Sequence, residues 1–570
     1  MSNMPYQQPT TPLQKKLDEL RRQAEERDAQ RRAARGGVPY ANLAKTPISI
    51  EAIKLIPEEE AKKAKAAAIE RDANKVAVAA LDPKAEAVSA IKKRFEDQGF
   101  EVRLFTASLP GLEQAWRLYE YVTAGVKNIT GKVEIEKQHF EELLGKFPNL
   151  QAVKNEMESI RAARTSTTEL LEVVLAGALS LKASDLHFEA EEKKARVRLR
   201  LDGLLHDVME DLPPKNYENL VSRIKLLSGL KMNVHGEPQD GRFSINLPTK
   251  EVEVRVSIIP SEFGETIVMR LLDPDSINVD LAGLGLRDDD LVFVQEELKK
   301  PHGLILNTGP TGSGKTTTLY AFLKTLLSPE IKIITVEDPI EYRIEGVEQT
   351  QVNPEVGYTF AGGLRAILRQ DPDAILVGEI RDKETADMAM QASLTGHIVL
   401  STLHTNDAVG AVPRLVDLGV KPQTIGPALS LVIAQRLVRK LCPRCKKETP
   451  LSAAEKENIK KFLEALPERV AREKYKNFKV FESVGCDACS GLGYKGRVGI
   501  YEFFKGGPEM EEIILKDASQ IALRKLADGQ KMVSMQTDGV LKVLSGITSF
   551  DEVEDVAGKV AFLEKRPKKA

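Results

Sequence analysis

The chain has 570 residues, of which 42% are hydrophobic and 29% charged, a composition that suits a soluble globular protein of three or four domains. The 82 lysines and arginines nearly balance the 84 acidic residues, so global charge gives no support for nucleic-acid binding. No apolar run reaches the roughly 18 residues needed to cross a bilayer, and the N-terminus lacks the apolar core of a secretory signal. We therefore expect a cytoplasmic chain without a transmembrane segment.

Two polar segments flank the first expected domain. Residues 1–45 are rich in Gln, Arg and Pro and poor in large apolar side chains, which predicts a disordered polar tail, with 15–35 at most a transient charged helix. Residues 126–160 are polar and helix-prone, and we expect a linker there.

Two α/β domains are predicted before the middle of the chain. Residues 46–125 alternate in the order helix, strand, helix, strand, helix, beginning with a helix rich in Ala and Lys. Residues 161–275 begin with an amphipathic helix at 165–181. The alternating pattern then predicts strands at 185–189, 195–201, 243–247 and 252–259.

The second half of the chain is predicted to be a larger α/β domain, at 280–563. Strands and helices alternate up to residue 440, which implies a mostly parallel sheet. A cysteine-containing insert at 441–490 follows, and helical sequence at 501–563 leads to a basic tail at 564–570.

A nucleotide-binding loop follows the first buried strand of this domain, at 304–307. The sequence GPTGSGKT at 309–316 has the GxxxxGK[ST] pattern between a strand and a helix, which is rarely met by chance. Glycines let main-chain N–H groups face a phosphate, Lys315 can reach the β and γ phosphates, and Thr316 can bind Mg²⁺. The predicted ATP-binding residues are Gly309, Pro310, Thr311, Gly312, Ser313, Gly314, Lys315, Thr316 and Thr317.

Acidic residues end two further strands. Glu379 follows the apolar strand 375–377, and we assign it to the Mg²⁺ shell; the alternative is a salt bridge with Arg381. Glu341 closes a cluster of three acids after the strand 332–336. It is the candidate for polarising the attacking water, and a solvated acidic turn is the alternative.

Two histidines flank the apolar strand 398–403. His397 precedes the strand and His404 follows it. A histidine beside the nucleotide can sense the γ-phosphate, whereas a lone histidine is more often structural. We retain His404 as the candidate catalytic residue.

These motifs together resemble the secretion-superfamily ATPases, in the branch of type IV pilus assembly (PilB-like) and type II secretion (GspE-like) ATPases. The similarity covers roughly residues 165–560. The matching motifs after the P-loop are TVEDPIEY at 335–342, LRAILRQDPD at 364–373 with VGEIRD at 377–382, and TGH at 395–397 with STLHT at 401–405.

The resemblance implies a fold and an assembly. It implies a RecA-like ATPase domain preceded by a PAS-like α/β domain, and a homo-hexamer whose ATP sites lie between the two. In such proteins, arginines of the preceding domain contact the phosphates. The matching residues are Arg255 and Arg270, with Arg242 a weaker candidate and structural strand salt bridges the alternative.

The small N-terminal domain resembles that of type II secretion ATPases, which docks on a membrane platform protein. The segment that carries this resemblance lies within residues 51–120. The chain lacks the Arg-Leu-Gly-like repeats with which some relatives bind cyclic di-GMP, so this ligand is not predicted.

Four cysteines form two C-x₂-C pairs, Cys442 with Cys445 and Cys486 with Cys489. Four thiolates in two such pairs suit a closed, structural Zn²⁺ site, and reduced metal-free thiols are the alternative. The assembly and secretion branch of the family carries the same feature, which retraction ATPases generally lack.

The sequence therefore predicts an ATPase that uses Mg²⁺ and drives type IV pilus assembly at the inner membrane through the platform protein. A type II secretion ATPase is the first alternative. A RecA-like nucleic-acid motor, a retraction motor and a non-hydrolysing scaffold are less favoured, and no nucleic-acid partner is expected.

Overall fold

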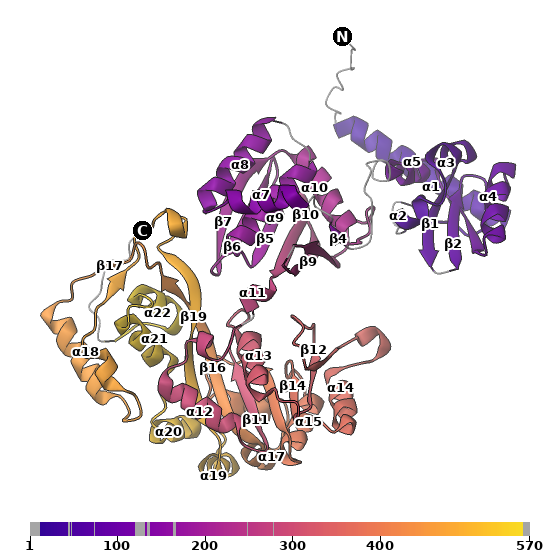
Figure 1. Cartoon of the computed structure of the whole chain (residues 1–570). Helices are drawn as coiled ribbons and strands as arrows, with labels where there is room; N and C mark the ends of the chain where they lie inside the picture. Colours follow the sequence, from indigo (N-terminus) through magenta and orange to yellow (C-terminus); the bar gives the residue numbers. More distant parts are fainter. Residues whose placement is uncertain are drawn as a thin grey trace. The chain divides into compact units, whose positions relative to one another are not determined.

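The computed structural model describes residues 12–43, 46, 48–72, 74–119, 132–133, 137–163, 167–247, 249–277 and 279–561. The chain forms two compact units, coloured by sequence in Figure 1. The N-terminal half comprises residues 1–146, 153–200 and 205–271, and the C-terminal half comprises 147–152, 201–204 and 272–570. Within the described part of the chain, no helix combines the length and apolarity needed to cross a membrane.

The N-terminal half begins with a small domain around a three-stranded sheet in the order β1-β2-β3. β2 pairs antiparallel with β1 and parallel with β3, and five of its six residues are buried. The elements are α1 (Pro12–Gly36), α2 (Ile50–Ile53), α3 (Glu58–Ala64), β1 (Ala66–Asp72), β2 (Lys75–Ala80), α4 (Glu86–Asp97), β3 (Glu101–Thr106) and α5 (Leu109–Arg117).

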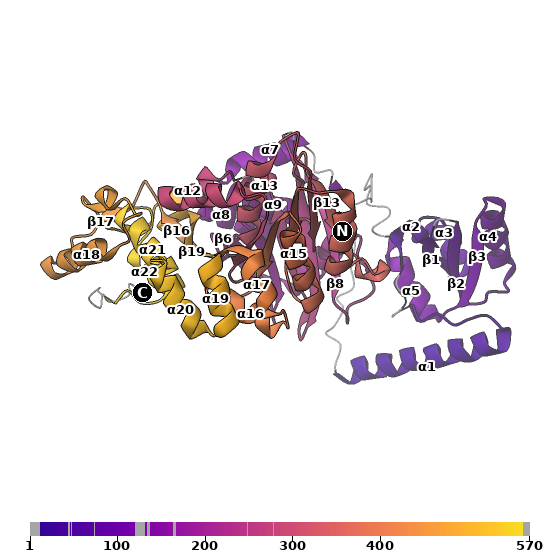
Figure 2. The ribbon, with the colours of Figure 1, turned by 90° about the horizontal axis from the view of Figure 1, so that it is seen from below.

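The predicted disordered tail is wrong for residues 12–36, which form α1, the long helix labelled in Figure 2. This helix packs against β3 and α5. Small side chains allow the close approach, since Ala29 and Ala33 are buried. The carboxylate of Glu26 accepts hydrogen bonds from the hydroxyls of Tyr40 and Ser108. Ala29, Ala33 and Glu26 therefore hold α1 against the small domain, although the polar composition of α1 predicts a solvent-exposed segment.

The predicted Ala- and Lys-rich helix is only partly present. α3 ends where Lys65 adopts a left-handed conformation with φ 47°, and the alanines that follow begin β1. Ala66, Ala67 and Ala68 are fully buried. Burial against β2 outweighs the helix propensity of alanine at these positions.

The predicted linker at 126–160 forms the helices that its sequence favours where the structure describes it, α7 (Lys137–Lys146) and α8 (Leu150–Ala163), but these helices are packed and do not form a free linker. α7 packs on α9, and Ser180 donates a 2.9 Å hydrogen bond to the Leu144 carbonyl. The buried apolar side chains of the two helices and their junction are Phe140, Leu143, Phe147, Leu150, Val153, Met157 and Ile160.

The second domain of the N-terminal half is built on a seven-stranded sheet in the order β4-β8-β9-β10-β5-β6-β7. The predicted helix and four strands are confirmed, and α10, β4, β7 and β10 are additional. The elements are β4 (Lys132–Val133), α9 (Thr167–Ser180), β5 (Asp185–Ala190), β6 (Ala195–Leu201), β7 (Leu204–Leu212), α10 (Pro214–Leu227), β8 (Gln239–Asn246), β9 (Glu251–Ser261) and β10 (Gly264–Leu272).

The C-terminal half contains the predicted, mostly parallel sheet, in the order β13-β12-β14-β15-β11-β16-β19. Only its edge strand β19 is antiparallel to its neighbour, and apolar clusters fill both faces. The elements up to the insert are α11 (Pro274–Ile277), α12 (Asp288–Leu298), β11 (Gly303–Thr308), α13 (Lys315–Leu326), β12 (Ile333–Glu337), β13 (Glu348–Gln351), α14 (Phe360–Ile367), β14 (Ala374–Val377), α15 (Lys383–Leu394), β15 (Ile398–Leu403), α16 (Ala411–Asp417), α17 (Pro422–Ala428) and β16 (Leu429–Leu441).

The insert and the C-terminal elements complete this half. The sequence predicts helix from residue 501, but β19 continues to Lys505 and the helices begin afterwards. The elements are β17 (Lys447–Glu448), α18 (Ala453–Ala465), β18 (Phe481–Glu482), β19 (Tyr494–Lys505), α19 (Pro508–Lys516), α20 (Gln520–Gly529), α21 (Met535–Leu544) and α22 (Phe550–Ala557).

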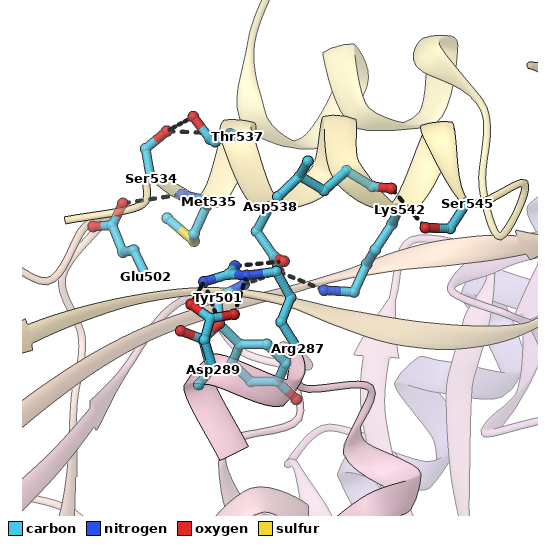
Figure 3. Close-up of polar contacts among 12 residues, drawn as sticks. Arg287, Asp289, Tyr501, Glu502, Ser534, Met535, Thr537, Asp538, Lys542 and Ser545 are labelled. Carbon is cyan, nitrogen blue, oxygen red and sulfur yellow. Dashed lines mark hydrogen bonds and ion pairs between the residues drawn. The ribbon is translucent and has the colours of Figure 1, made fainter. Parts of the chain in front are cut away.

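A buried charge network joins the start of α12 to α21 (Figure 3). The Arg287 guanidinium lies 2.6 Å from Asp290 and 2.8 Å from Asp538, and Lys542 lies 2.5 Å from Asp538. Burial disfavours the Asp538 carboxylate, but Lys542 and Arg287 outweigh it and hold the pKa of this group below its usual range. Asp538 also accepts a hydrogen bond from the main-chain N–H of Tyr501, which lies on β19, so the network includes this strand.

Candidate nucleotide-binding site

The P-loop lies at the carboxyl end of β11, where ligands bind in open α/β sheets. All six residues of β11 are buried, and α13 begins at Lys315. Gly309 and Gly314 have φ values of 149° and 88°, which side chains rarely allow. A Cβ atom at Gly314 would lie 2.8 Å from the Gln435 amide nitrogen, so the loop has no room for a side chain there.

Lys315 is the first residue of α13, and its side chain folds back onto the P-loop. Its ammonium group donates to the carbonyl oxygens of Gly309 at 2.8 Å and Pro310 at 3.1 Å. Burial lowers the pKa of Lys315, and the nearby Glu379 carboxylate opposes the shift. A triphosphate would supply the anionic partners that this partly desolvated cation favours.

Gln435 of β16 supports the P-loop by binding the two elements that flank it, a role that the sequence analysis missed. Its side-chain oxygen accepts hydrogen bonds from Asn307 at 2.9 Å and Thr318 at 2.8 Å, linking β11 to α13. Arg436 follows Gln435 directly in β16, so no local pattern distinguished Gln435 from the other polar residues of the strand.

Glu379 lies just past β14, and its side chain is 15% exposed. The structure contains the salt bridge considered as the alternative, because one oxygen lies 2.5 Å from Arg381. The other oxygen lies 3.6 Å from His404 Nε2. Glu379 also interacts electrostatically with Lys315, so this acid, His404 and the P-loop lysine share one site.

The two histidines lie at opposite ends of β15. β15 runs parallel to β11, and Ile398 is aligned with Gly303. His397 therefore lies at the amino edge of the sheet, where its Nδ1 is 2.9 Å from the Ala392 carbonyl oxygen. Only His404 lies at the edge that carries the P-loop.

The acids after β12 have different surroundings. Glu337 is 3% exposed and accepts hydrogen bonds from Tyr320, Thr335 and Gln349. Burial raises the pKa of Glu337, and these three donors oppose the shift. Glu341 lies four residues beyond β12, and its main chain hydrogen-bonds to the Tyr320 hydroxyl on the P-loop helix.

The candidate arginines lie on strands of the N-terminal half and make the salt bridges considered as their alternative role. On β9, Arg255 lies 3.3 Å from Glu253. On β10, Arg270 lies 3.0 Å from Asp185 and remains half exposed. Arg242 on β8 is directly opposite Arg255, so two positive side chains are cross-strand neighbours.

The four cysteines come together as a compact cluster. Their sulfur atoms all lie within 4.8 Å of one another, with Cys442–Cys486 at 3.9 Å and Cys445–Cys489 at 3.8 Å. Four thiolates around one zinc at about 2.3 Å have sulfur atoms about 3.8 Å apart. Main-chain N–H groups of Cys486 and Gly493 point at the Cys489 sulfur, as in the outer shell of a metal site. The cluster therefore fits a tetrahedral metal ion.

The insert is attached to α12 by ion pairs. Arg469 lies 3.1 Å from Asp290 and also pairs with Asp289, and Lys474 pairs with Asp288. The three acids in the first turn of α12 interact favourably with the partial positive charge of the helix N-terminus. The cations of the insert reduce the repulsion among these acids.

The family model described as Type II/IV secretion system protein matches residues 161–555, well over half of the chain. The chain belongs to this family. A P-loop, acidic strand ends and a carboxyl-edge histidine in a secretion-system protein identify the chain as an ATPase of the PilB-like and GspE-like group.

Relatives of the Type II/IV secretion system family match over different lengths. The type IV pilus assembly ATPase PilB of Myxococcus xanthus is 38% identical over 526 residues, covering 91% of this chain and 88% of that protein. The type II secretion system protein E of Pseudomonas aeruginosa is 47% identical over 386 residues, covering 67% of this chain and 74% of that protein.

A solved relative has the same fold. The ATPase DotB of Legionella pneumophila has a TM-score of 0.50 at 23% identity, covering 68% of this chain and 95% of that protein. The predicted α/β architecture with a RecA-like ATPase domain is thereby confirmed for this member of the secretion family.

The small N-terminal domain matches a separate model, the MshEN domain, over residues 36–109. The match begins ten residues before the predicted domain start and includes Tyr40, which bridges to Thr106 on β3. The domain therefore begins earlier than the sequence analysis predicts.

Proposed function

We propose that this chain is the hexameric motor that adds pilin subunits to a type IV pilus at the inner membrane. The observation that carries the proposal is the length of the similarity to the Myxococcus xanthus PilB, which extends over 91% of the chain. The type II secretion relative covers 67% of the chain. A match that extends over more of the chain favours pilus assembly.

The proposed reaction is ATP hydrolysis by the residues at the carboxyl edge of the sheet. Mg²⁺ would supply charge neutralisation between the phosphates, held by Thr316 and, through water, by Glu379. Lys315 and the P-loop N–H groups would bind the β and γ phosphates, and Glu341 would orient and polarise the attacking water. His404, which contacts Glu379, would respond to the γ-phosphate.

Arg255 and Arg270 are proposed to contact the phosphates from the N-terminal half of the same ring. Both lie on strands, and Arg270 is half exposed. A planar guanidinium stabilises the charge that develops on a transferring phosphoryl group. Closure of the ring around ATP would complete the site, and opening after hydrolysis would move a membrane platform protein.

The cysteine cluster is proposed to hold one structural Zn²⁺. All four ligands are thiolates of the protein, which leaves no open position for substrate. Without a cation, burial and the neighbouring thiols raise the pKa of Cys445 to about 12, so metal binding would favour the thiolate form.

A second candidate function is type II secretion, driving pseudopilus assembly. The observation that favours it is the higher identity of type II secretion proteins in the shared region, 47% against 38% for PilB. Both candidates use the same ATPase chemistry and differ in the platform protein that they engage.

The test is ATP turnover by the purified chain with the cytoplasmic domain of a pilus platform protein or of a secretion platform protein. We expect stimulation by the pilus domain and a native mass of six chains. Stimulation by the secretion domain alone would move the assignment to type II secretion, and stimulation by DNA would favour a nucleic-acid motor instead. A monomer under all conditions would contradict the ring.

A further inference from the structure

Tyr320 links the P-loop helix to a buried carboxylate. It lies on α13, five residues after Lys315, and is fully buried. Its hydroxyl donates a hydrogen bond to Glu337, at the end of β12. The other oxygen of Glu337 accepts from Thr335 at 2.6 Å and from Gln349 at 3.1 Å. A buried acid with three donors is a fixed anchor, and losing the Tyr320 donor would leave one of its desolvated oxygens without a side-chain partner among these three.

The same hydroxyl meets the loop that carries Glu341. The main-chain N–H of Glu341 donates to the Tyr320 oxygen, which in turn donates to Glu337. Hydrogen bonds in such a chain polarise and strengthen one another in a water-excluded site. Tyr320 therefore connects α13, which begins at the phosphate-binding lysine, to the residue proposed to position water.

Gln349 of β13 holds the next residues of the same loop. Its oxygen accepts the Ile344 N–H at 2.8 Å, and its nitrogen donates to the Tyr342 carbonyl at 3.1 Å. The rings of Tyr320 and Tyr342 pack edge to face with centroids 4.6 Å apart. The main chain at 341, 342 and 344 is thus fixed by two side chains, which limits how the Glu341 carboxylate can move.

We propose that Tyr320 is a positioning residue for ATP hydrolysis. Its hydroxyl holds the main chain of Glu341 at a fixed position relative to the P-loop helix α13. The inference rests on the proposed role of Glu341 as the water-positioning acid. Tyr320 itself touches no reacting atom. It acts by fixing the main chain of Glu341 relative to α13, and so relative to the phosphates that Lys315 binds.

The test compares Tyr320→Phe with Tyr358→Phe. Tyr320→Phe keeps the ring packing on Tyr342 and removes the hydroxyl that Glu341 and Glu337 share. We expect kcat to fall about 10- to 100-fold, since small displacements of a catalytic group cost this much. KM for ATP and the Kd of a fluorescent ATP analogue should stay within about twofold, because the phosphate-binding loop is unchanged.

Tyr358→Phe is the matched control. It removes a tyrosine hydroxyl that donates a 3.0 Å hydrogen bond to Thr350, the residue beside Gln349 on β13, and leaves the Glu341 loop intact. Its kcat should match the wild type. A kcat for folded Tyr320→Phe within twofold of the wild type would overturn the proposal, and so would an equal loss in both variants.

A double mutant separates this inference from the role of Glu341. In a Glu341→Gln background, Tyr320→Phe should cause little further loss of kcat, because the two residues act as one unit. Losses that multiply would show that Tyr320 acts by another route and would refute the positioning role. Near-wild-type turnover by Glu341→Gln alone would instead refute the proposed water-positioning acid.

A second variant keeps the proposal testable if Tyr320→Phe does not fold. Gln349→Met removes the hydrogen bonds to Tyr342 and Ile344, and the one to Glu337, while retaining side-chain length. We expect the same pattern, a lower kcat with unchanged nucleotide affinity. An unchanged kcat in this variant would contradict the claim that fixing the loop matters for turnover.

Discussion

The ammonium group of Lys315 has two main-chain carbonyl oxygens of its own loop as hydrogen-bond acceptors. Neutral acceptors compensate a buried cation less well than anionic ones. Phosphate oxygens at the same place would be better partners, and the lowered pKa of Lys315, which burial causes, is the sign of this unmet demand. The Lys315 ammonium group is therefore placed to bind an anionic ligand. Without that ligand, its partial burial lowers the stability of the fold.

Lys315→Ala should lower ATP turnover by roughly 10²–10³-fold or more, because a charge that stabilises the transferring phosphoryl group is lost. Steady-state phosphate release measures the effect. Lys525→Ala, at an exposed site on α20, is the matched control and should be fully active. Hydrolysis by Lys315→Ala at the control rate would refute the P-loop assignment.

Which residues could be predicted depended on whether their partners are close in sequence. The P-loop and Glu379 follow strands directly, so a local pattern places them at the carboxyl edge of the sheet. Gln435 and Tyr320 act through residues over a hundred and 17 positions away, respectively, and no local pattern reveals such pairs. The Arg381 salt bridge with Glu379 was weighed as an alternative and is present.

At the scale of elements, buried ion pairs connect the start of α12 to α21, in addition to apolar packing. Asp538 of α21 is completely buried and lies between Arg287 and Lys542. Breaking a buried ion pair by removing one partner leaves an uncompensated charge in a desolvated place. The contact is therefore sensitive to a single substitution.

Asp538→Ala should lower the free energy of unfolding of the C-terminal half by about 3–5 kcal/mol, because Arg287 and Lys542 lose their shared counter-charge. Urea denaturation followed by circular dichroism measures the change. Asp528→Ala, at an exposed position on α20, should change stability by less than about 0.5 kcal/mol. Equal stability of both variants would mean that the network contributes nothing.

The cysteine insert should depend on its metal. We expect one zinc per chain by elemental analysis. Removal by a strong chelator should expose the insert to protease, because folding and metal binding are coupled in such sites. Cys442→Ser should reduce zinc content in the same way. Thiols that react fully with a mercurial without releasing zinc would show that the cluster is metal-free.

Elements with strong local patterns were predicted well, and elements that depend on distant packing were not. β11, the P-loop and α13 have a continuous apolar strand, a glycine loop and a periodic helix. α1 is almost entirely polar, and its attachment depends on the burial of Ala29 and Ala33 and on hydrogen bonds that Glu26 accepts from distant residues. β1 begins with three alanines, and their pairing with the neighbouring strand β2 decides that they form a strand.

At the scale of the whole molecule, the proposed phosphate contacts come from both compact units of the chain. Arg255 and Arg270 lie on strands of the first, and Lys315 lies in the second. Association of the halves around ATP would provide a natural step for coupling hydrolysis to movement.

Arg270→Ala should reduce kcat on the order of 10³-fold, the scale expected of an arginine that stabilises the transition state, with ATP binding largely retained. Turnover and equilibrium nucleotide binding should be measured on the same preparation. Arg196→Ala, on β6 of the same sheet, is the control and should keep its activity. Unchanged turnover by Arg270→Ala would leave it with only its salt bridge to Asp185.

The order of the C-terminal elements along the chain has a consequence for biosynthesis. β19 completes the sheet beyond the cysteine insert, and Asp538 supplies the counter-charge for an arginine encoded about 250 codons earlier. The chain must therefore be translated past residue 538 before the ATPase half can close. Nascent chains halted upstream of β19 would expose an unfinished sheet edge, so premature termination should yield substrates for chaperones and proteases instead of folded ATPase.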